Sequence, residues 1–205
     1  MSRLRVAAIV EGDGEVAAVP ILLRRLWPAL GGHYIDVLSP PIRRKRADFE
    51  RKRELQRAVA LAASKLKHAP GNDPALVLLL FDCERDGGLP CQLGPQAMQW
   101  ASAAFAHLDI ACVVANIEYE TWFVAAAESL DKFVQLRAGE LVPDTPEQRR
   151  CGKGWIEARF RGVKYSETQD QPRMTAVMDF ALARPRSPSF DKLCRELEKR
   201  LITSG

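Results

Sequence analysis

Residues 4–15 read LRVAAIVEGDGE: an apolar run ends at Val10, and Glu11, two glycines and two more acids follow at once. A run without the apolar–polar alternation of a half-exposed strand is typical of a strand buried on both faces of a parallel sheet. The glycines allow the chain to turn sharply out of that strand. We therefore expect Glu11 at the carboxyl end of a central strand, the edge of an open α/β sheet where ligands bind.

Three further apolar runs predict strands over residues 34–38, 75–81 and 110–117. Apolar residues that recur every three or four positions predict helices between the strands and after them. Because strand and helix alternate, the fold class is α/β: a central, mostly parallel sheet of about four strands with helices on both faces. The expected helices cover residues 16–30, 48–68, 95–107, 121–136, 171–183 and 189–202.

The second half of the chain is less regular than the first. Residues 142–165 are rich in Pro, Gly and Arg without a clear period, which indicates an irregular basic insertion. Two closing helices follow it, and Ser189 is the expected N-cap of the last. We expect an α/β core over residues 1–137, with the basic insertion and a C-terminal helical extension packed on it over residues 138–205. The sequence leaves open whether this tail wraps around the sheet or forms a small helical lobe.

Acidic residues directly follow two of the other predicted strands. Asp82, Glu84 and Asp86 come after the most apolar strand at alternate positions, so in an extended chain they face one side. Glu118 and Glu120 follow the fourth strand, where either could instead stabilise the first turn of the next helix. Each motif by itself also fits an ordinary polar turn.

The joint placement of these acids carries more weight than any single motif. Parallel strands end at a common edge, so the sheet would gather the carboxylates, and close carboxylates repel unless a proton or a cation intervenes. Oxygen ligands suit Mg²⁺ or Mn²⁺, and such an ion could bind phosphate oxygens and activate water. The sequence therefore predicts a divalent-cation site at this edge.

These motifs resemble the Toprim fold, which topoisomerases, bacterial primases and overcoming-lysogenization-defect type nucleases share. More closely, the chain resembles a Toprim-related bacterial family, the domain of unknown function 4276. The resemblance covers nearly the whole chain and implies a Toprim-like Rossmannoid sheet. It rests on VEGDGE (10–15), FDCERD (81–86), IEYETWF (117–123), VKYSETQDQPRMT (163–175) and RPRSPSF (184–190).

The resemblance also implies roles for individual acids. Glu11 matches the Toprim glutamate, which acts as a general acid or base or helps to hold the metal. Asp82 matches the first Asp of the Asp-x-Asp metal motif, Glu84 stands in place of the second, and Asp86 is a further acid. Glu120 matches the acid of the family's Glu-x-Trp signature. Members look like small partners of ATPases in bacterial defence loci, so the resemblance suggests an ATPase partner.

Basic residues are concentrated in two segments. Between residues 43 and 67, ten basic residues stand against three acids, although the whole chain has a net charge of only +4. Such a concentration favours a phosphate backbone, and it also fits a solvated helix face. In the second segment, Trp155 is the aromatic residue that best suits contact with a base or a partner. The residues expected to contact phosphate or nucleic acid are Arg43, Arg44, Lys45, Arg46, Lys153 and Lys164.

Several classes of protein are disfavoured. The longest apolar run is too short to cross a membrane, so we expect no membrane contact. The five cysteines are scattered without a Cys-x-x-Cys pair, which favours a reducing cytoplasm over a disulfide framework or a zinc ribbon. The three histidines are dispersed, and no phosphate-binding P-loop motif occurs.

Three functions remain. The leading hypothesis is a cytoplasmic, Mg²⁺- or Mn²⁺-dependent protein that hydrolyses or otherwise processes phosphodiester bonds in nucleic acid, and the resemblance suggests a role in bacterial defence. Glu11 would be its acid or base, and Asp82, Glu84, Asp86 and Glu120 would hold the metal. The second hypothesis is a non-catalytic regulatory or toxin-like partner of an ATPase, and the third is a nucleotide phosphohydrolase. The choice between DNA and RNA, and the oligomeric state, stay open.

Overall fold

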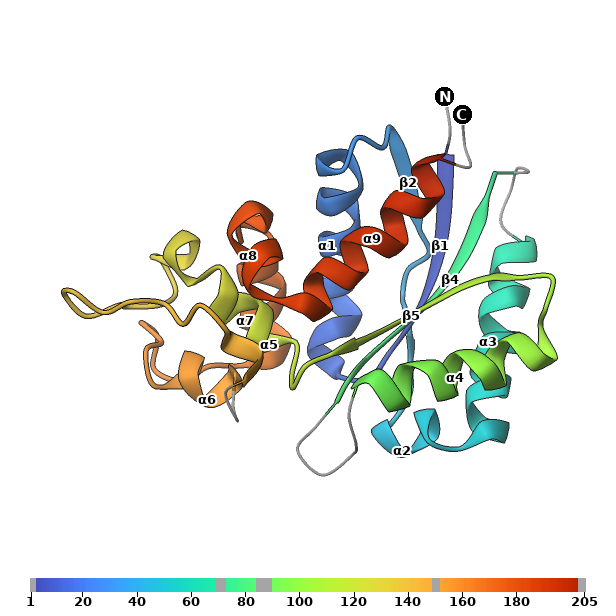
Figure 1. Cartoon of the computed structure of the whole chain (residues 1–205), viewed down its shortest axis with the longest axis horizontal. Coiled ribbons are helices and arrows are strands. Elements are labelled where there is room, and N and C mark those ends of the chain that lie inside the picture. The colour runs from blue at the N-terminus through green and yellow to red at the C-terminus, as the bar shows by residue number, and fades with distance from the viewer. Residues whose placement is uncertain (1–2, 69–72, 84–89, 149–151, 203–205) are drawn as a thin grey trace.

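A parallel sheet forms the centre of this computed structural model, which describes residues 3–68, 73–83, 90–148 and 152–202 (Figure 1). Its four main strands lie in the order β2-β1-β4-β5, and all neighbours are parallel. The predicted fold class is thus confirmed. The strands are β1 (Arg3–Val10), β2 (Tyr34–Val37), β4 (Ala75–Asp82) and β5 (Asp109–Ala115).

Helices cover both faces of this sheet, as the sequence predicts (Figure 1). Because successive strand residues point to opposite faces, Val6 and Ala8 pack into one core while Ala7 and Ile9 pack into the other. The first core is closed by α1 (Asp13–Ala29) and α9 (Pro188–Ile202). The second is closed by α3 (Lys52–His68) and α4 (Pro90–Ala104). Each fully buried Leu or Val contributes roughly 1.5–3 kcal/mol.

Two elements of the first half differ from the prediction. The short strand β3 (Ile42–Arg43) pairs with the end of β1, and two residues are too few to be recognised from a pattern. The helix expected over residues 48–68 is divided into α2 (Arg46–Phe49) and α3, because Phe49 is buried and stacks on Phe81 with ring centroids 4.3 Å apart.

The segment after β5 is more broken than predicted. The helix expected over residues 121–136 ends early as α5 (Glu120–Ala125), followed by a 3₁₀ turn, η1 (Ala127–Leu130). The helix expected over residues 171–183 is replaced by two. The elements that follow η1 are η2 (Pro146–Gln148), α6 (Gly152–Glu157), α7 (Glu167–Thr175) and α8 (Phe180–Arg186).

Capping residues explain where the late helices begin. The Asp179 carboxylate accepts a hydrogen bond from the Ala181 N–H at 2.7 Å, which starts α8 as a new helix. The prediction that Ser189 caps the last helix is wrong, since α9 begins at Pro188. Ser187 is the residue before that proline, and its Oγ accepts from the Phe190 N–H at 3.2 Å.

The C-terminal helices pack on the first face of the sheet. Met174, Phe190 and Leu197 are fully buried in the core that also contains Val6 of β1. No helix within the described ranges is long and apolar enough to cross a membrane.

Gly14 provides a test of this packing, because it lies where α1 meets α7. A Cβ at Gly14 would come within 2.4 Å of Gln171 Oε1 and 2.7 Å of the Glu167 carbonyl oxygen. We expect Gly14→Ala to lower the free energy of unfolding by about 1–3 kcal/mol, measured by urea denaturation.

Gly94 is the matched control, since it is also a buried helical glycine. Its Cβ would meet only Val114 Cγ2, at 3.6 Å. Gly94→Ala should leave the free energy of unfolding unchanged or raise it by about 0.5–1 kcal/mol. Equal losses in the two variants would contradict the close contact of α1 with α7.

Candidate functional site

The carboxyl end of the sheet gathers acidic residues from three separate parts of the chain. The register pairs Val10 with Leu80 and Asp82 with Ala115, so β1, β4 and β5 end close together. The Asp82 N–H donates a hydrogen bond to Glu11 Oε2 at 3.2 Å, which joins the first two motifs directly. We name this group the carboxylate edge; its members are Glu11, Glu15, Asp82, Glu118 and Glu120.

Glu15 is the member of the carboxylate edge that the sequence analysis missed. Its Oε2 accepts hydrogen bonds from the N–H groups of Glu11 (2.9 Å) and Gly12 (3.1 Å). These hydrogen bonds are the return contact of a capping box, in which the side chain at the third helical position binds the backbone of the N-cap. The sequence feature that predicts it is a Glu three residues after the N-cap, Gly12. Glu15 is only 2% exposed. Burial raises its pKa to about 8, despite the two backbone hydrogen bonds that lower it, and the carboxylates of Glu11 and Glu120 add to the rise.

Asp82 lies among the other acids of this edge, and its pKa is raised. Burial raises the pKa of Asp82 well above its usual range, and the nearby carboxylates of Glu15, Glu120, Glu11 and Glu118 raise it further. Its Oδ1 is buried and has no hydrogen-bond partner within the described part of the chain. A buried carboxylate oxygen without a partner is uncommon and calls for a proton or a bound ion.

Glu120 is held from the C-terminal half of the chain. Its Oε1 accepts hydrogen bonds from the Tyr165 hydroxyl (2.8 Å) and from Gln171 Nε2 (3.3 Å). The residue is 3% exposed, and burial raises its pKa to about 7 although the Tyr165 hydrogen bond lowers it. Glu118 accepts the Lys153 N–H at 2.7 Å. Glu118 and Glu120 therefore hold the C-terminal part of the chain against the sheet edge through these hydrogen bonds.

The first basic segment lies at the same end of β1 as Glu11. Arg43 is paired in register with Val10, and its Nε is 2.7 Å from Asp13 Oδ1. The Arg44 N–H donates to the Val10 carbonyl at 2.8 Å, and Lys45 precedes α2 as an exposed residue. Arg43, Arg44 and Lys45 thus border the carboxylate edge.

The remaining predicted phosphate contacts differ in exposure. The Arg46 side chain is only 12% exposed: its guanidinium lies 5.3 Å from the Phe81 ring centroid and 3.0 Å from Glu50 Oε1. Lys153 Nζ is 2.5 Å from Glu167 Oε1, and Lys164 is exposed.

Trp155 corrects one expectation of the sequence analysis. Its ring is 7% exposed, belongs to the first core and lies 4.1 Å from the Arg159 guanidinium, so it does not face a base or a partner. The signal was present in the sequence, because an aromatic residue within a helical turn is usually buried. Trp27 and Trp122 are fully buried as well.

Two of the four predicted metal ligands, Glu84 and Asp86, lie outside the described residues. Among the described residues, no three His, Cys, Asp or Glu side chains are placed to hold a metal ion together. The donors nevertheless suit a hard cation, since all are carboxylates and Asp82 Oδ1 has no hydrogen-bond partner within the described ranges.

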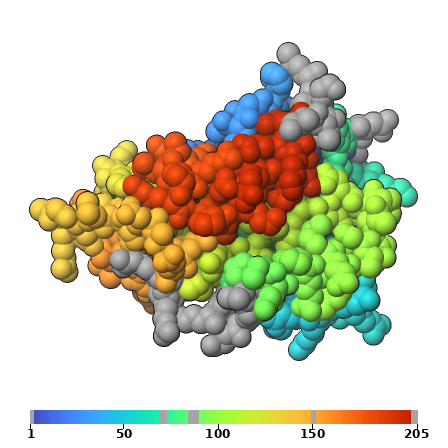
Figure 2. All heavy atoms as spheres, viewed as in Figure 1, coloured from blue at the N-terminus to red at the C-terminus, as the bar shows by residue number. Residues whose placement is uncertain are grey.

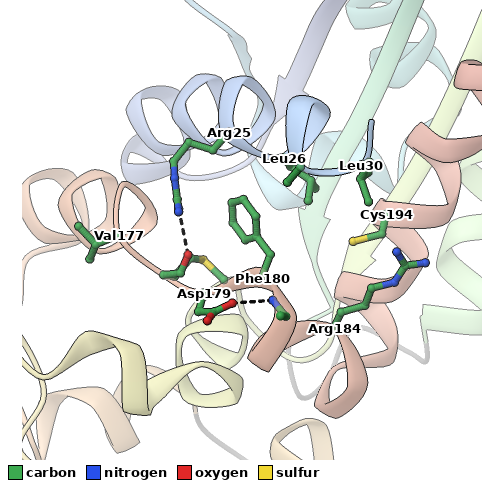
Figure 3. A pocket seen from close by; sticks show the side chains of 11 residues that line it. Arg25, Leu26, Leu30, Val177, Asp179, Phe180, Arg184 and Cys194 are labelled. Atoms are coloured by element: carbon green, nitrogen blue, oxygen red, sulfur yellow. Dashed lines mark hydrogen bonds between the residues drawn. The ribbon is translucent and has the colours of Figure 1, made fainter. Parts of the chain in front are cut away.

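A cavity of about 530 Å³ lies between α1, α8 and α9, but it does not offer a site for an anion (Figure 3). Arg25 Nη1 donates to the carbonyl oxygens of Thr175 (2.6 Å) and Met178 (3.0 Å). Arg184 is paired with Asp191 and Glu198 at 2.8 and 2.6 Å. Both cations that line the cavity are therefore engaged within the chain.

The fold and the edge together define an α/β protein with a carboxylate-lined sheet end. The chain belongs to the family described as domain of unknown function (DUF4276), whose sequence pattern matches residues 10–198. No curated protein matches the chain. One solved structure, the C-terminal region of the OLD protein of Xanthomonas campestris pv. campestris, is similar with a TM-score of 0.36 and 16% sequence identity. The alignment covers 99% of this chain and 97% of that one.

The raised pKa of Glu15 predicts a pH-dependent stability when divalent cations are removed. The folded chain holds the Glu15 proton up to about pH 8, whereas the unfolded chain releases it near pH 4.5, so the free energy of unfolding falls as pH rises between these values. Glu15→Gln keeps an acceptor for the two N–H groups but carries no charge. Relative to wild type it should gain about 1–3 kcal/mol at pH 8.5 and about 1 kcal/mol or less at pH 5, measured by urea denaturation in EDTA.

Glu196→Gln is the control with the opposite sign. Burial raises the pKa of Glu196, but hydrogen bonds from Lys199, Lys192 and Arg200 outweigh burial and lower it to about 2. The ionised carboxylate therefore stabilises the fold above pH 4.5, and this variant should lose stability at pH 8.5. The same sign for both variants at pH 8.5 would contradict the electrostatic account.

Proposed function

We propose that the chain is a divalent-cation-dependent phosphodiester hydrolase that acts on nucleic acid at the carboxylate edge. The observation that carries the proposal is the contact of Glu11 with the Asp82 main chain, beside an Asp82 Oδ1 that is buried without a partner among the residues that the structure describes. Two acids 71 positions apart in the chain are thus brought together. A cation would relieve the mutual repulsion that raises the pKa of Asp82.

Asp82 and Glu120 would hold Mg²⁺ or Mn²⁺, together with Glu84 and Asp86. When bound, the ion supplies positive charge to the phosphodiester oxygens and lowers the pKa of water. Glu11 would take a proton from the attacking water as the new O–P bond forms, and would return it to the leaving oxygen as the old P–O bond breaks. Glu15, behind Glu11, would hold its own proton at neutral pH and so limit the charge of the edge.

The basic residues around the edge support a polyanionic substrate. Arg43 and Arg44 border the edge beside β1, and Lys153 borders it beside Glu118. Arg43 also pairs with Asp13 and Lys153 with Glu167, but both of these cations are partly exposed and within reach of a ligand. Cations that flank a carboxylate site attract a phosphate backbone and hold it against the repulsion of the acids. Such contacts would be independent of base sequence and sensitive to salt.

A specific observation favours the second candidate, a non-catalytic partner of an ATPase. Leu141 is 88% exposed and Val163 is fully exposed. Arg159 forms an ion pair with Glu140, next to Leu141, so this loop is fastened to the segment after α6. Exposed aliphatic residues in these segments, between η1 and η2 and between α6 and α7, would suit docking to another protein.

Asp82→Asn tests the hydrolase proposal. It removes one charge from the edge and keeps the side-chain shape, so Mn²⁺ affinity should fall at least about tenfold and cleavage of single- or double-stranded DNA or RNA at least about a hundredfold. Mn²⁺ binding is measured by calorimetry and cleavage on labelled oligonucleotides.

Asp13→Asn is the matched control, because Asp13 lies in the same acidic turn but its exposed carboxylate pairs with Arg43. It should keep Mn²⁺ affinity within about twofold of wild type. If Asp82→Asn binds Mn²⁺ as wild type does, the proposal is wrong. A wild-type chain that binds no Mn²⁺ would favour the ATPase partner instead.

A further inference from the structure

A mostly apolar groove of about 580 Å³ runs along the outer edge of β5. Figure 1 shows β5 passing between α9 and α4, and Figure 2 shows these two helices on the same face of the molecule. Gly94 and Met98 of α4 form one wall, and Lys192 of α9 lies on the other. Cys112 and Val114 of β5 lie between them. A groove of this size with few polar groups is typical of a site for a small organic group.

One end of this groove lies beside the carboxylate edge. The register pairs Asp82 with Ala115, and Asn116, the next residue, lines the groove. Paired strands are about 4.8 Å apart and consecutive Cα atoms are 3.8 Å apart, so the Cα atoms of Asn116 and Asp82 are separated by roughly 6 Å. A single nucleotide could therefore reach from one to the other.

Apart from Lys192, whose Nζ is 3.1 Å from Glu196 Oε1, the polar side chains that line the groove include Asn116, Glu147 and Ser189 at that same end. Glu147 Oε1 accepts hydrogen bonds from the Ser187 hydroxyl (2.5 Å), the Ser189 N–H (2.8 Å) and the Ser189 hydroxyl (2.7 Å). Glu147 Oε2 accepts only a long contact from Asn116 Nδ2, at 3.4 Å, among the described residues. Because a carboxylate oxygen has two acceptor positions, Oε2 can still accept from a ligand.

We propose that this groove holds a nucleobase whose exocyclic amino group stands beside an acceptor ring nitrogen, as in cytosine or adenine but not guanine, of the nucleic acid that the carboxylate edge cleaves. The substrate assignment rests on the proposed function, and the base assignment on the groove. The apolar walls face the plane of the base, Glu147 accepts from its amino group, and the Asn116 amide meets the neighbouring ring nitrogen. Carboxylate and amide side chains recognise these bases in this way.

The assignment restricts the form of the substrate as well. A base in this groove is unpaired, so the strand is single-stranded or the base is extruded from a duplex. Uracil and thymine present a carbonyl oxygen where cytosine has its amino group, and the Glu147 carboxylate repels it. The groove therefore discriminates by the amino group and not by base size.

Nucleoside binding to the full chain tests the proposal, with cytidine, adenosine and uridine as probes in calorimetry. Gly94→Leu fills the groove, whereas Gly94→Ala adds only a Cβ that meets Val114 Cγ2 at 3.6 Å. Cytidine and adenosine should bind wild type and Gly94→Ala alike, and at least about tenfold more weakly to Gly94→Leu. Uridine should bind at least about tenfold more weakly than cytidine to wild type. Equal binding of uridine, or unchanged binding to Gly94→Leu, would overturn the proposal.

A second readout needs no variant, in case Gly94→Leu does not fold. Cys91 is exposed and lines the groove, whereas Cys83, Cys112 and Cys194 are buried. Saturating cytidine should slow maleimide alkylation of Cys91 at least about threefold, followed on the Cys91 peptide by mass spectrometry. Unchanged alkylation would overturn the proposal.

Failure of this inference can be distinguished from failure of the hydrolase proposal. Cytidine has no phosphate, so Asp82→Asn should bind it as wild type does. Loss of cytidine binding in Asp82→Asn would place the nucleoside at the carboxylate edge and overturn the groove assignment. Absence of cytidine binding, with Mn²⁺ binding intact, would overturn the groove assignment and leave the hydrolase proposal standing.

Discussion

Mutual repulsion among buried carboxyl groups at one end of a parallel sheet is the constraint around which this chain is organised. Parallel pairing of β1 with β4 and of β4 with β5 brings Glu11, Asp82 and the segment of Glu120 to the same edge. Burial of these groups is unfavourable unless each is protonated, hydrogen-bonded or bound to a cation. The C-terminal half stabilises one of these groups, because Tyr165 and Gln171 donate hydrogen bonds to Glu120. Gly14 lets α7 approach closely enough for this contact.

The central sheet was predictable because β1, β4 and β5 are mostly apolar and buried on both faces. Every residue of β1 after Arg3 is buried, and Arg5 is the one charged residue among them. The breaks in the helices were not predictable in the same way. Phe49 leaves the helical period to stack on Phe81, and Asp179 restarts a helix by capping it. In both places a specific contact overrides a periodic pattern that continues through the break.

The acids of the site were found by their position after strands, and the contacts among them were not. Glu15 was hidden because a capping Glu and a site Glu look alike in a sequence. Trp155 was taken for a contact residue because its segment is basic, whereas it is buried beneath Arg159. The groove beside β5 is built from α4, β5 and α9, whose residues are up to about a hundred positions apart. Such a site depends on tertiary packing and has no local signature.

The most direct test of the carboxylate edge as a cation site is anomalous diffraction from crystals of the full chain soaked in Mn²⁺. We expect an anomalous peak in contact with Asp82 Oδ1, the buried oxygen that has no hydrogen-bond partner in the described part of the chain. Peaks only at other positions, or no peak at saturating Mn²⁺, would contradict it. The role of the edge would then be to join the tail to the sheet, through the hydrogen bonds of Glu118 and Glu120.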